Sequence, residues 1–235
     1  MSPARRGVSR KPPVRDSVRT QIKQTLLERI VDGTYEPGQR LKELQIAREF
    51  QTSQAPVREA LRELEAVGLI ETKYYQGSRV RMSSHSELEQ AYEIRASLEE
   101  LAARSAALVL KSHTKHLRKI IDKLAMLSKK GEWQSYTRFN YLLHRSIVGA
   151  SGNSLLLHVW DSLHFEFRTR LFFVERTASD IIRLDREHFD IVEALHCGDG
   201  KRAGRLLREH CLKNIRILRR SRLGHSSSSA SGTHS

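Results

Sequence analysis

The sequence predicts a mainly α-helical protein with two folded parts, an N-terminal winged helix-turn-helix with a small β-hairpin wing and then an all-α helical bundle. Two observations carry this prediction. Helical patterns and one hairpin pattern follow each other within residues 16–83. From residue 84 to about 222 the strand pattern disappears and apolar residues recur at helical spacing. A chain of 235 residues with 39% hydrophobic residues can bury a core in each part.

Composition excludes several classes of protein. Lys and Arg number 41 against 27 Asp and Glu, and this net charge of +14 favours a polyanionic partner such as nucleic acid. Two cysteines, Cys197 and Cys211, are too few for a disulfide framework or a four-thiolate zinc site. The longest uncharged stretch, 146–160, is too short and too broken by glycines to span a bilayer. We therefore expect a soluble, cytoplasmic protein with no membrane partner.

The two ends of the chain differ from the rest in composition. Residues 1–15 contain five basic residues, no acidic residue and three prolines, which is typical of a disordered basic arm. Residues 223–235 are rich in serine and are expected to form a disordered tail. Residues 16–83 hold 11 basic and 10 acidic residues and are nearly neutral. We therefore expect the arm to supply affinity for DNA of any sequence.

Three helices and a hairpin are expected in the N-terminal part. A first helix over 16–33 has apolar residues at steps of four and ends before a Tyr-Glu-Pro-Gly turn. Residues 43–50 form a short second helix. The third segment, 52–71, has a serine as its N-cap and a proline in its first turn, and a glycine stops it. Residues 69–82 hold β-favouring residues around Gln-Gly-Ser, which indicates a two-strand hairpin.

The third helix carries side chains suited to reading base edges. In a helix-turn-helix, the first turns of this helix enter the major groove of DNA. Gln54, Ala55 and Arg58 occupy the outward positions. A guanidinium can donate two hydrogen bonds to guanine, and a glutamine can pair with adenine. Arg62, one turn further on, is expected to meet a phosphate. The alternative is a solvated face on which these arginines form i,i+4 pairs with Glu59 and Glu63.

The run PGQRLKELQIAREFQTSQAPVREALRELEAVGLIE and the glycine-centred hairpin after it resemble the winged helix of the bacterial GntR family of transcriptional regulators. The resemblance covers about residues 16–82. It implies that Arg58 contacts an operator guanine and that Gly77 lets the wing approach the minor groove. Gln54 and Leu44 stand where many relatives have DNA-contacting arginines. The resemblance thus implies a double-stranded operator that differs from the common family sequence.

The C-terminal part is expected to contain six helices. Ser86 and Glu89 have the spacing of a capping box for a long first helix that reaches Leu110. Glycine-containing breaks separate the remaining helical patterns. These patterns cover about residues 114–128, 132–150, 154–174, 179–196 and 201–222.

Histidines on three of these helices fall on the apolar faces. His188 lies between Ile181, Leu184, Val192 and Leu195, and His210 also points inward. Asn140 and His144 are four residues apart and project from one side of their helix. Together these side chains could surround one divalent metal, and imidazole suits Zn, Ni, Fe or Cu. The alternative is that each histidine is a core residue bonded to a backbone carbonyl.

Four stretches in this part, YEIRASLEELAARSAA, NYLLHRSIVGASGN, REHFDIVEALHCGD and RLLREH, are similar to the FCD ligand-binding domain of the FadR branch. The similarity covers about residues 86–220. It implies a divalent metal ion, Zn or Ni, held by Asn140, His144, His188 and His210. Asn140 replaces the commoner Asp and is a neutral, weaker ligand. The similarity also implies a small organic acid as effector.

Arg95 lies in the inward sector of the first helix of this domain, where an unpaired guanidinium would be costly. It can pair with an effector carboxylate in a bidentate manner. A structural pair with Glu99 is the alternative.

These features predict a regulator that binds DNA as a homodimer, with 16–83 as the DNA-binding domain and 84–222 as the effector-binding and dimerisation domain. We expect a repressor that a small organic acid releases from a palindromic operator. Two other classes stay open. One is a metal-dependent enzyme using the histidines, although no general base of the His-Glu-x-x-His kind and no nucleophile elbow is found. The other is an architectural DNA-binding protein that needs no effector.

Overall fold

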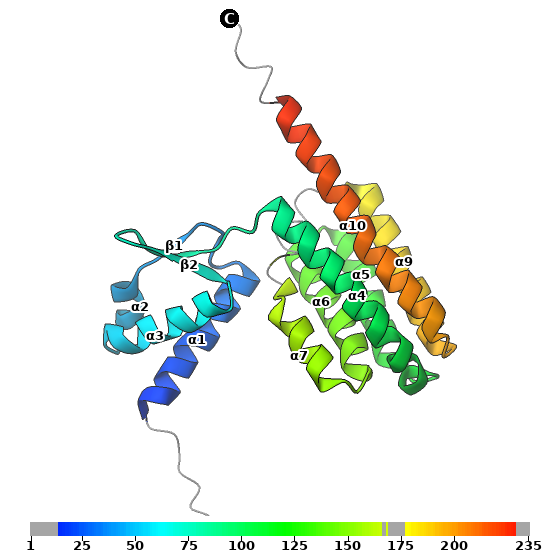
Figure 1. Cartoon of the computed structure of the whole chain (residues 1–235), viewed down its shortest axis with the longest axis horizontal. Coiled ribbons are helices and arrows are strands. Elements are labelled where there is room, and N and C mark those ends of the chain that lie inside the picture. The colour runs from blue at the N-terminus through cyan, green and yellow to red at the C-terminus, as the bar shows by residue number, and fades with distance from the viewer. Residues whose placement is uncertain (1–13, 166–167, 169–176, 229–235) are drawn as a thin grey trace, which may run out of the picture. The chain divides into compact units, whose positions relative to one another are not determined.

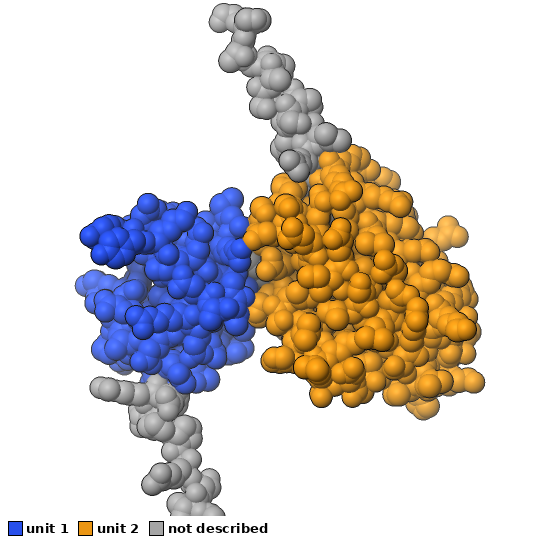
Figure 2. Space-filling view, viewed as in Figure 1, with its two compact units in different colours: residues 1–82 blue, residues 83–235 orange. Residues whose placement is uncertain are grey.

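The structure is a computed structural model that describes residues 14–165, 168 and 177–228. The chain divides into two compact units, Met1–Met82 and Ser83–Ser235 (Figure 2). The expected basic arm at 1–15 lies outside the described residues, apart from its last two residues, which begin the first helix.

The first unit is a three-helix domain with a small antiparallel sheet (Figure 1). The strand order is β1-β3-β2, and Ile70 lies opposite Val80 in the register of β2 and β3. The short strand β1 was not expected from the sequence. The elements are α1 (Val14–Asp32), β1 (Arg40–Leu41), α2 (Glu43–Glu49), α3 (Gln54–Ala66), β2 (Ile70–Lys73) and β3 (Gly77–Val80).

The core of this unit is built from the apolar faces that the sequence pattern shows. Ile22, Leu26 and Ile30 of α1 are buried, as their spacing of four predicts. From α3, Val57, Leu61 and Leu64 are buried, and α1 and α3 make the most extensive helix contact in the unit. The third helix therefore turns its opposite face to solvent.

The second unit is an all-helical bundle in which α4 and α10 lie side by side (Figure 1). Gly200 and Gly204 allow this close packing, since a Cβ atom would lie 2.6 Å from the carbonyl oxygen of Arg104 at the first and 2.9 Å from that of Glu100 at the second. The helices are α4 (His85–Leu110), α5 (Lys115–Lys130), α6 (Trp133–Ala150), α7 (Ser154–Ser162), α9 (Ala178–His196) and α10 (Gly200–Ser228).

Three helix ends differ from the sequence prediction. The capping box of α4 is formed by Ser84 and Glu87, so the prediction of Ser86 and Glu89 was wrong. The helix expected over 154–174 is interrupted, because α7 ends at Ser162 and His164 has a positive φ of 47°. Helix α10 runs to Ser228 and so includes the first part of the expected tail at 223–235. The remainder of that tail lies outside the described residues.

Candidate functional site

The exposed face of α3 presents the side chains that the sequence assigns to DNA. Ala55, Arg58 and Arg62 are exposed, and Gln54 is half-buried in the first turn. Behind them, Pro56 and Ala60 are buried with the apolar face. The N-terminal turns of α3 are thus anchored on the core. Their polar side is exposed, as it must be in a helix that enters the major groove of DNA.

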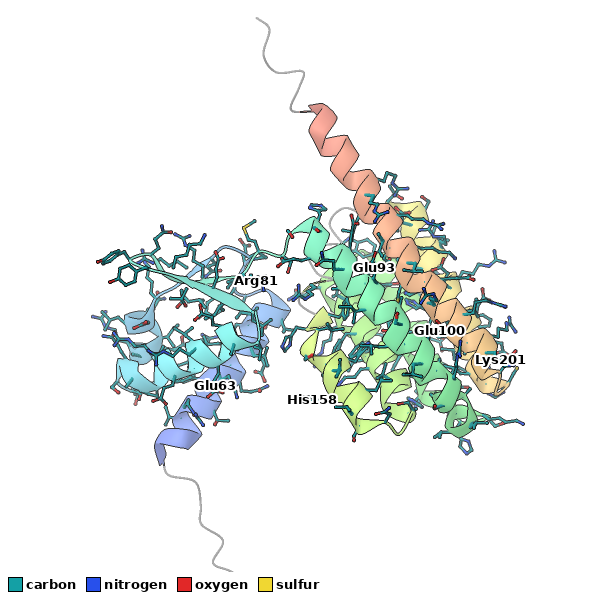
Figure 3. The ribbon with its side chains drawn as sticks, viewed as in Figure 1. Glu63, Arg81, Glu93, Glu100, His158 and Lys201 are labelled. Atoms are coloured by element: carbon teal, nitrogen blue, oxygen red, sulfur yellow. The ribbon has the colours of Figure 1, made fainter. Side chains whose placement is uncertain are left out.

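Arg58 is held by a residue of another helix. Its Nε donates to Oε2 of Glu43 on α2 at 2.6 Å, and its Nη2 donates to Oε1 of Gln54 at 3.2 Å. Glu63, which Figure 3 labels on α3, pairs instead with Lys23 and Arg19 of α1, at 2.6 and 3.1 Å. The ion pair of Arg58 is therefore made with another helix and not with Glu59 or Glu63 of α3, and its contact within α3 is the hydrogen bond to Gln54. Glu43 was not identified from the sequence.

The wing carries two fully exposed aromatic side chains next to its glycine. Tyr74 and Tyr75 are 82% and 89% exposed, and their ring centroids are 4.1 Å apart. Gly77 has a φ of +75°, in the left-handed region that favours glycine. Lys73 lies opposite Gly77 at the end of β2. The hairpin tip therefore presents two aromatic side chains to solvent and is flanked by a basic residue.

The three predicted histidines meet in the interior of the second unit. His144 on α6, His188 on α9 and His210 on α10 are each 3% exposed or less. Their ring centroids are 4.7 to 5.6 Å apart, and one nitrogen of each lies within 4.8 Å of the others. Nitrogens around a tetrahedral zinc ion would be about 3.3 Å apart, so the three rings would have to move slightly inward to hold one.

Two carboxylates fix the orientation of two of these rings. Nδ1 of His144 donates to Oε2 of Glu99 at 2.7 Å, and Nδ1 of His210 donates to Oε2 of Glu187 at 2.9 Å. In both residues this leaves Nε2 as the atom available to a metal. Nε2 of His144 is buried and has no hydrogen-bond partner among the described residues. The arrangement resembles the outer shell of a histidine metal site more closely than a set of core histidines bonded to backbone carbonyls.

The protonation states of these groups suit metal ligation. Burial, reinforced by the nearby charge of Arg95, lowers the pKa of His144 to about 4, and burial also lowers the pKa of His210. Both imidazoles are therefore neutral at pH 7, which is the form that binds a metal. Burial opposes the ionised form of Glu99, but the charge of Arg95 and the hydrogen bonds from His144 and Arg95 outweigh it and hold the pKa of Glu99 below its usual range.

Asn140 is buried on α6, one helical turn before His144. The predicted set of Asn140, His144, His188 and His210 thus shares one region of the core, and the structure brings the nitrogens of the three histidines together. Cys211, next to His210 on α10, donates its thiol to Oε2 of Glu99 at 3.5 Å. Burial raises the pKa of this thiol well above its usual value, so it stays protonated.

Arg95 and Glu99 form a buried ion pair. Nε of Arg95 donates to Oε1 of Glu99 at 2.5 Å, and both side chains are nearly inaccessible to solvent. The structural pair considered for Arg95 is therefore present. Nη2 of Arg95, however, is buried without a hydrogen-bond partner among the described residues. The guanidinium carbon also lies 4.6 Å from the ring centroid of Phe165.

Glu99 links Arg95 to the histidine cluster. Its Oε1 accepts from Arg95 and, at 2.9 Å, from Nε1 of Trp160, while its Oε2 accepts from His144. The same carboxylate therefore contacts both the guanidinium with an unmet donor and the first histidine of the cluster. The sequence indicated Glu99 only as a partner for Arg95.

A winged helix with an arginine-bearing third helix, followed by a helical domain with a buried polar site, defines a DNA-binding regulator with a sensor domain. The chain belongs to the bacterial GntR family, because residues 18–80 match the model of "Bacterial regulatory proteins, gntR family" and residues 90–213 match that of the FCD domain. It is a ligand-responsive DNA-binding transcriptional regulator. No helix of the described residues is long and apolar enough to cross a bilayer.

Several curated relatives are similar over most of their length. A probable D-xylose utilization operon transcriptional repressor of Paenarthrobacter nicotinovorans is 35% identical over 83% of this chain and 86% of its own. The regulator LutR of Bacillus subtilis (strain 168) is 29% identical over 79% of this chain and 94% of its own. These relatives are transcription regulators.

Solved structures share the fold. Escherichia coli McbR/YncC has a TM-score of 0.73 and 22% identity, and covers 86% of this chain and 97% of its own. A GntR regulator of Rhodococcus sp. RHA1 has a TM-score of 0.74 and 22% identity, with coverage of 86% and 98%. Both likenesses support a fold in which a winged helix is followed by a helical bundle.

Proposed function

We propose that this protein is a cytoplasmic, homodimeric repressor that a small organic acid releases from a palindromic operator. The observation that carries the proposal is the buried polar site of the second unit, where Arg95 and His144 contact opposite oxygens of Glu99 and each has a nitrogen without a partner among the described residues. Unmet buried donors and acceptors are costly unless a ligand satisfies them.

The exposed face of α3 is the surface that contacts the bases of the operator in this proposal. Arg58 has Nη atoms beyond the Nε that Glu43 engages, and these suit guanine O6 and N7 in the major groove. Gln54 and Ala55 stand beside it in the first turn, and Arg62 one turn on suits a phosphate. Gly77, with its positive φ, lets the chain make the tight turn at the wing tip that would approach the minor groove.

The metal site of the proposal consists of Asn140, His144, His188 and His210. The donor set fits a divalent ion such as Zn or Ni, since the three histidines are buried and the ring orientation of two of them is fixed by carboxylates. A metal bound there supplies a Lewis-acidic centre for an effector carboxylate. Asn140 contributes no charge, so a metal would keep more of its positive charge for an anionic ligand than with Asp.

Arg95 is the proposed effector-binding residue. Its pair with Glu99 holds the guanidinium in place through Nε, and Nη2 remains to donate to a carboxylate. One relative, a gluconate operon transcriptional repressor of Bacillus subtilis (strain 168), is named after an operon for an organic acid. This name and that of the D-xylose relative support a carbohydrate-derived acid as the class of effector and repression as the outcome.

The test uses an operator selected by the purified protein from random duplexes, and a panel of carboxylic acids that includes gluconate. An effector should raise the thermal midpoint of unfolding, because it binds the folded protein. It should also lower operator affinity, because it binds one folded conformation better than the other. Arg95→Lys keeps the charge toward Glu99 but loses the planar fork, so we expect a smaller thermal shift with the same acid.

Two outcomes would contradict the proposal. A protein that gains no stability from any acid of the panel and keeps its operator affinity would fit the architectural class. A protein that converts its ligand, as followed by chromatography of the acid, would fit the metal-dependent enzyme.

A further inference from the structure

The turn of the wing carries the two most exposed large apolar side chains among the described residues. Tyr74 and Tyr75 lie between β2 and β3, and more than four fifths of each residue is accessible to solvent. Their ring centroids are 4.1 Å apart with an angle of 62° between the ring planes, so the two rings form one aromatic pair. Because so little of their surface packs on the domain, the pair contributes little to the folding of the winged helix.

The backbone at Tyr75 has a conformation that a bulky residue rarely adopts. Its φ is +62°, in the left-handed region. The N–H of Gln76 donates to the carbonyl oxygen of Lys73 at 3.0 Å, so Tyr75 is the third residue of a tight turn. When φ is positive at this position, glycine or asparagine is the usual residue. Strained residues of this kind cluster at functional sites, and the fold itself gives no reason for a tyrosine here.

Basic side chains flank the tyrosine pair. Lys73 precedes it, and Nζ of Lys73 lies 3.4 Å from Oε1 of Glu71 in an exposed ion pair, which a phosphate can displace. The guanidinium of the exposed Arg40 on β1 lies beside Gly77, since a Cβ atom on that glycine would be 3.7 Å from Nε and from Nη2. Residues 73–77 include no acidic residue. These charges favour a polyanion as the neighbour of the pair.

The chemistry of tyrosine favours the sugar-phosphate wall of DNA over the stacked bases. A ring that wedges between base pairs puts its tip into the stack, where a phenol O–H would lose its hydrogen-bond partners. The side chains that wedge between bases are accordingly apolar, such as phenylalanine, leucine and methionine. Against the wall of a groove, the ring can contact deoxyribose while the hydroxyl reaches a phosphate oxygen.

We propose that Tyr74 and Tyr75 bind the DNA backbone beside the minor groove of the operator, with their rings against deoxyribose and their hydroxyls donating to phosphates. The inference rests on the proposed function, which brings the wing to the minor groove. It adds a neutral contact to the charged ones. A neutral contact releases no counterions, so its contribution to affinity depends little on salt. The tyrosines hold the register of the wing on the DNA, and the bases are read by α3.

Salt titration of operator binding separates a tyrosine contact from a lysine contact. Tyr74→Ala combined with Tyr75→Asn should weaken operator binding about tenfold, the loss expected for two hydrogen bonds, and leave the slope of log K against log [salt] unchanged. Lys73→Ala should reduce the magnitude of that slope by about 0.9, as for one lost phosphate contact. Met82→Ala removes an exposed apolar side chain outside the turn and is the control, with wild-type binding.

The choice of Tyr75→Asn separates loss of contact from loss of folding. Asparagine tolerates the left-handed conformation, so this variant should unfold at the wild-type temperature or above while it binds operator more weakly. Tyr74→Phe combined with Tyr75→Phe keeps the rings and removes the hydroxyls. Its affinity should lie between that of the wild type and that of the Tyr74→Ala, Tyr75→Asn variant.

Two footprints locate the contact on the operator. Hydroxyl radicals cut DNA at deoxyribose, and dimethyl sulfate methylates N7 of guanine in the major groove. At saturating protein, the Tyr74→Ala, Tyr75→Asn variant should lose protection of sugars along the minor groove. It should keep the protection of guanines that α3 provides in the wild type.

Wild-type affinity and wild-type sugar protection in the Tyr74→Ala, Tyr75→Asn variant overturn the inference and leave the proposed function standing. A variant that sediments with weaker self-association and keeps the wild-type footprint assigns the tyrosines to a protein contact, which also overturns the inference. A wild-type chain that selects no duplex overturns the proposed function, and the tyrosine contact with it.

Discussion

Arg58 and Glu43 are joined by an ion pair of 2.6 Å between Nε and Oε2, although they lie on different helices of the winged helix. Both ends of this pair are on the exposed side of the domain, where the arginine is 58% accessible. An exposed ion pair adds little to stability. Its consequence is geometric, because it holds the guanidinium at the surface that we assign to the major groove.

Arg58→Ala should abolish specific operator binding and leave the fold intact. Loss of a bidentate contact to guanine costs about 1 to 3 kcal/mol. Gel-shift titration at fixed salt measures the change, and Arg48→Ala, an exposed arginine on α2, is the control. Unchanged operator affinity of Arg58→Ala would remove this residue from the DNA-reading set.

Glu43→Gln should weaken operator binding less than Arg58→Ala does, by about tenfold or 1.4 kcal/mol. The arginine remains, but it loses the charged acceptor that orients Nε. Discrimination against operators with a changed guanine should fall in the same variant. Tighter binding by Glu43→Gln would mean that the carboxylate competes with DNA for Arg58.

His188→Ala should lose the divalent metal that we expect at about one ion per chain in protein purified without a histidine tag. Elemental analysis of the purified protein measures it. His158→Ala is the matched control, since His158 is exposed on α7 and lies apart from the cluster (Figure 3). Equal metal content in both variants, or none in the wild type after reconstitution, would count against the site.

Glu99→Gln should destabilise the helical domain by about 3 to 5 kcal/mol, because it leaves the buried guanidinium of Arg95 without a counter-charge. Urea unfolding followed by tryptophan fluorescence reports this domain, since both tryptophans, Trp133 and Trp160, belong to it. Glu193→Gln removes a solvent-exposed pair with Arg118 and should unfold like the wild type. A wild-type unfolding free energy for Glu99→Gln would contradict the importance of the pair.

Acid should destabilise the protein partly through Asp180. Burial opposes its charged form, but hydrogen bonds to the carboxylate from the backbone N–H and hydroxyl of Thr177 and from Arg220 outweigh it and lower the pKa of Asp180. The unfolded chain therefore binds more protons than the folded chain as pH falls through and below the ordinary aspartate range. The stabilisation is complete above that range and is lost as pH falls further. In urea titrations from pH 7 to 3, Asp180→Asn should show a shallower loss than the wild type, and equal slopes would refute the assignment.

Periodicity in the sequence was enough to predict the fold class and the helices that carry the histidines. Apolar spacing also placed Val57, Leu61 and Leu64 against the core and left Arg58 outside. The capping box was misplaced because Ser84 with Glu87 and Ser86 with Glu89 have the same spacing, and only the observed start of α4 separates them. Strand β1, at two residues, is too short to show alternation.

The residues that support the two sites were harder to predict, because they act across helices. Glu43 reaches Arg58 from 15 residues away, and Glu187 reaches His210 from 23 residues away. Spacing rules describe neighbours on one helix, so they identified Glu99 as a partner of Arg95 and missed its bond to His144. The clustering of His144, His188 and His210 was predictable, since polar residues on apolar helix faces stand out.

Gly200 and Gly204 of α10 pack directly against the backbone of α4. With so little room between the two backbones, any residue larger than glycine at either position would bring its Cβ against the carbonyl oxygen of Arg104 or Glu100 and push the two helices apart. Helix α4 carries Arg95, and α10 carries His210. The spacing between the helix that carries Arg95 and the helix that carries His210 is therefore set by two residues without side chains.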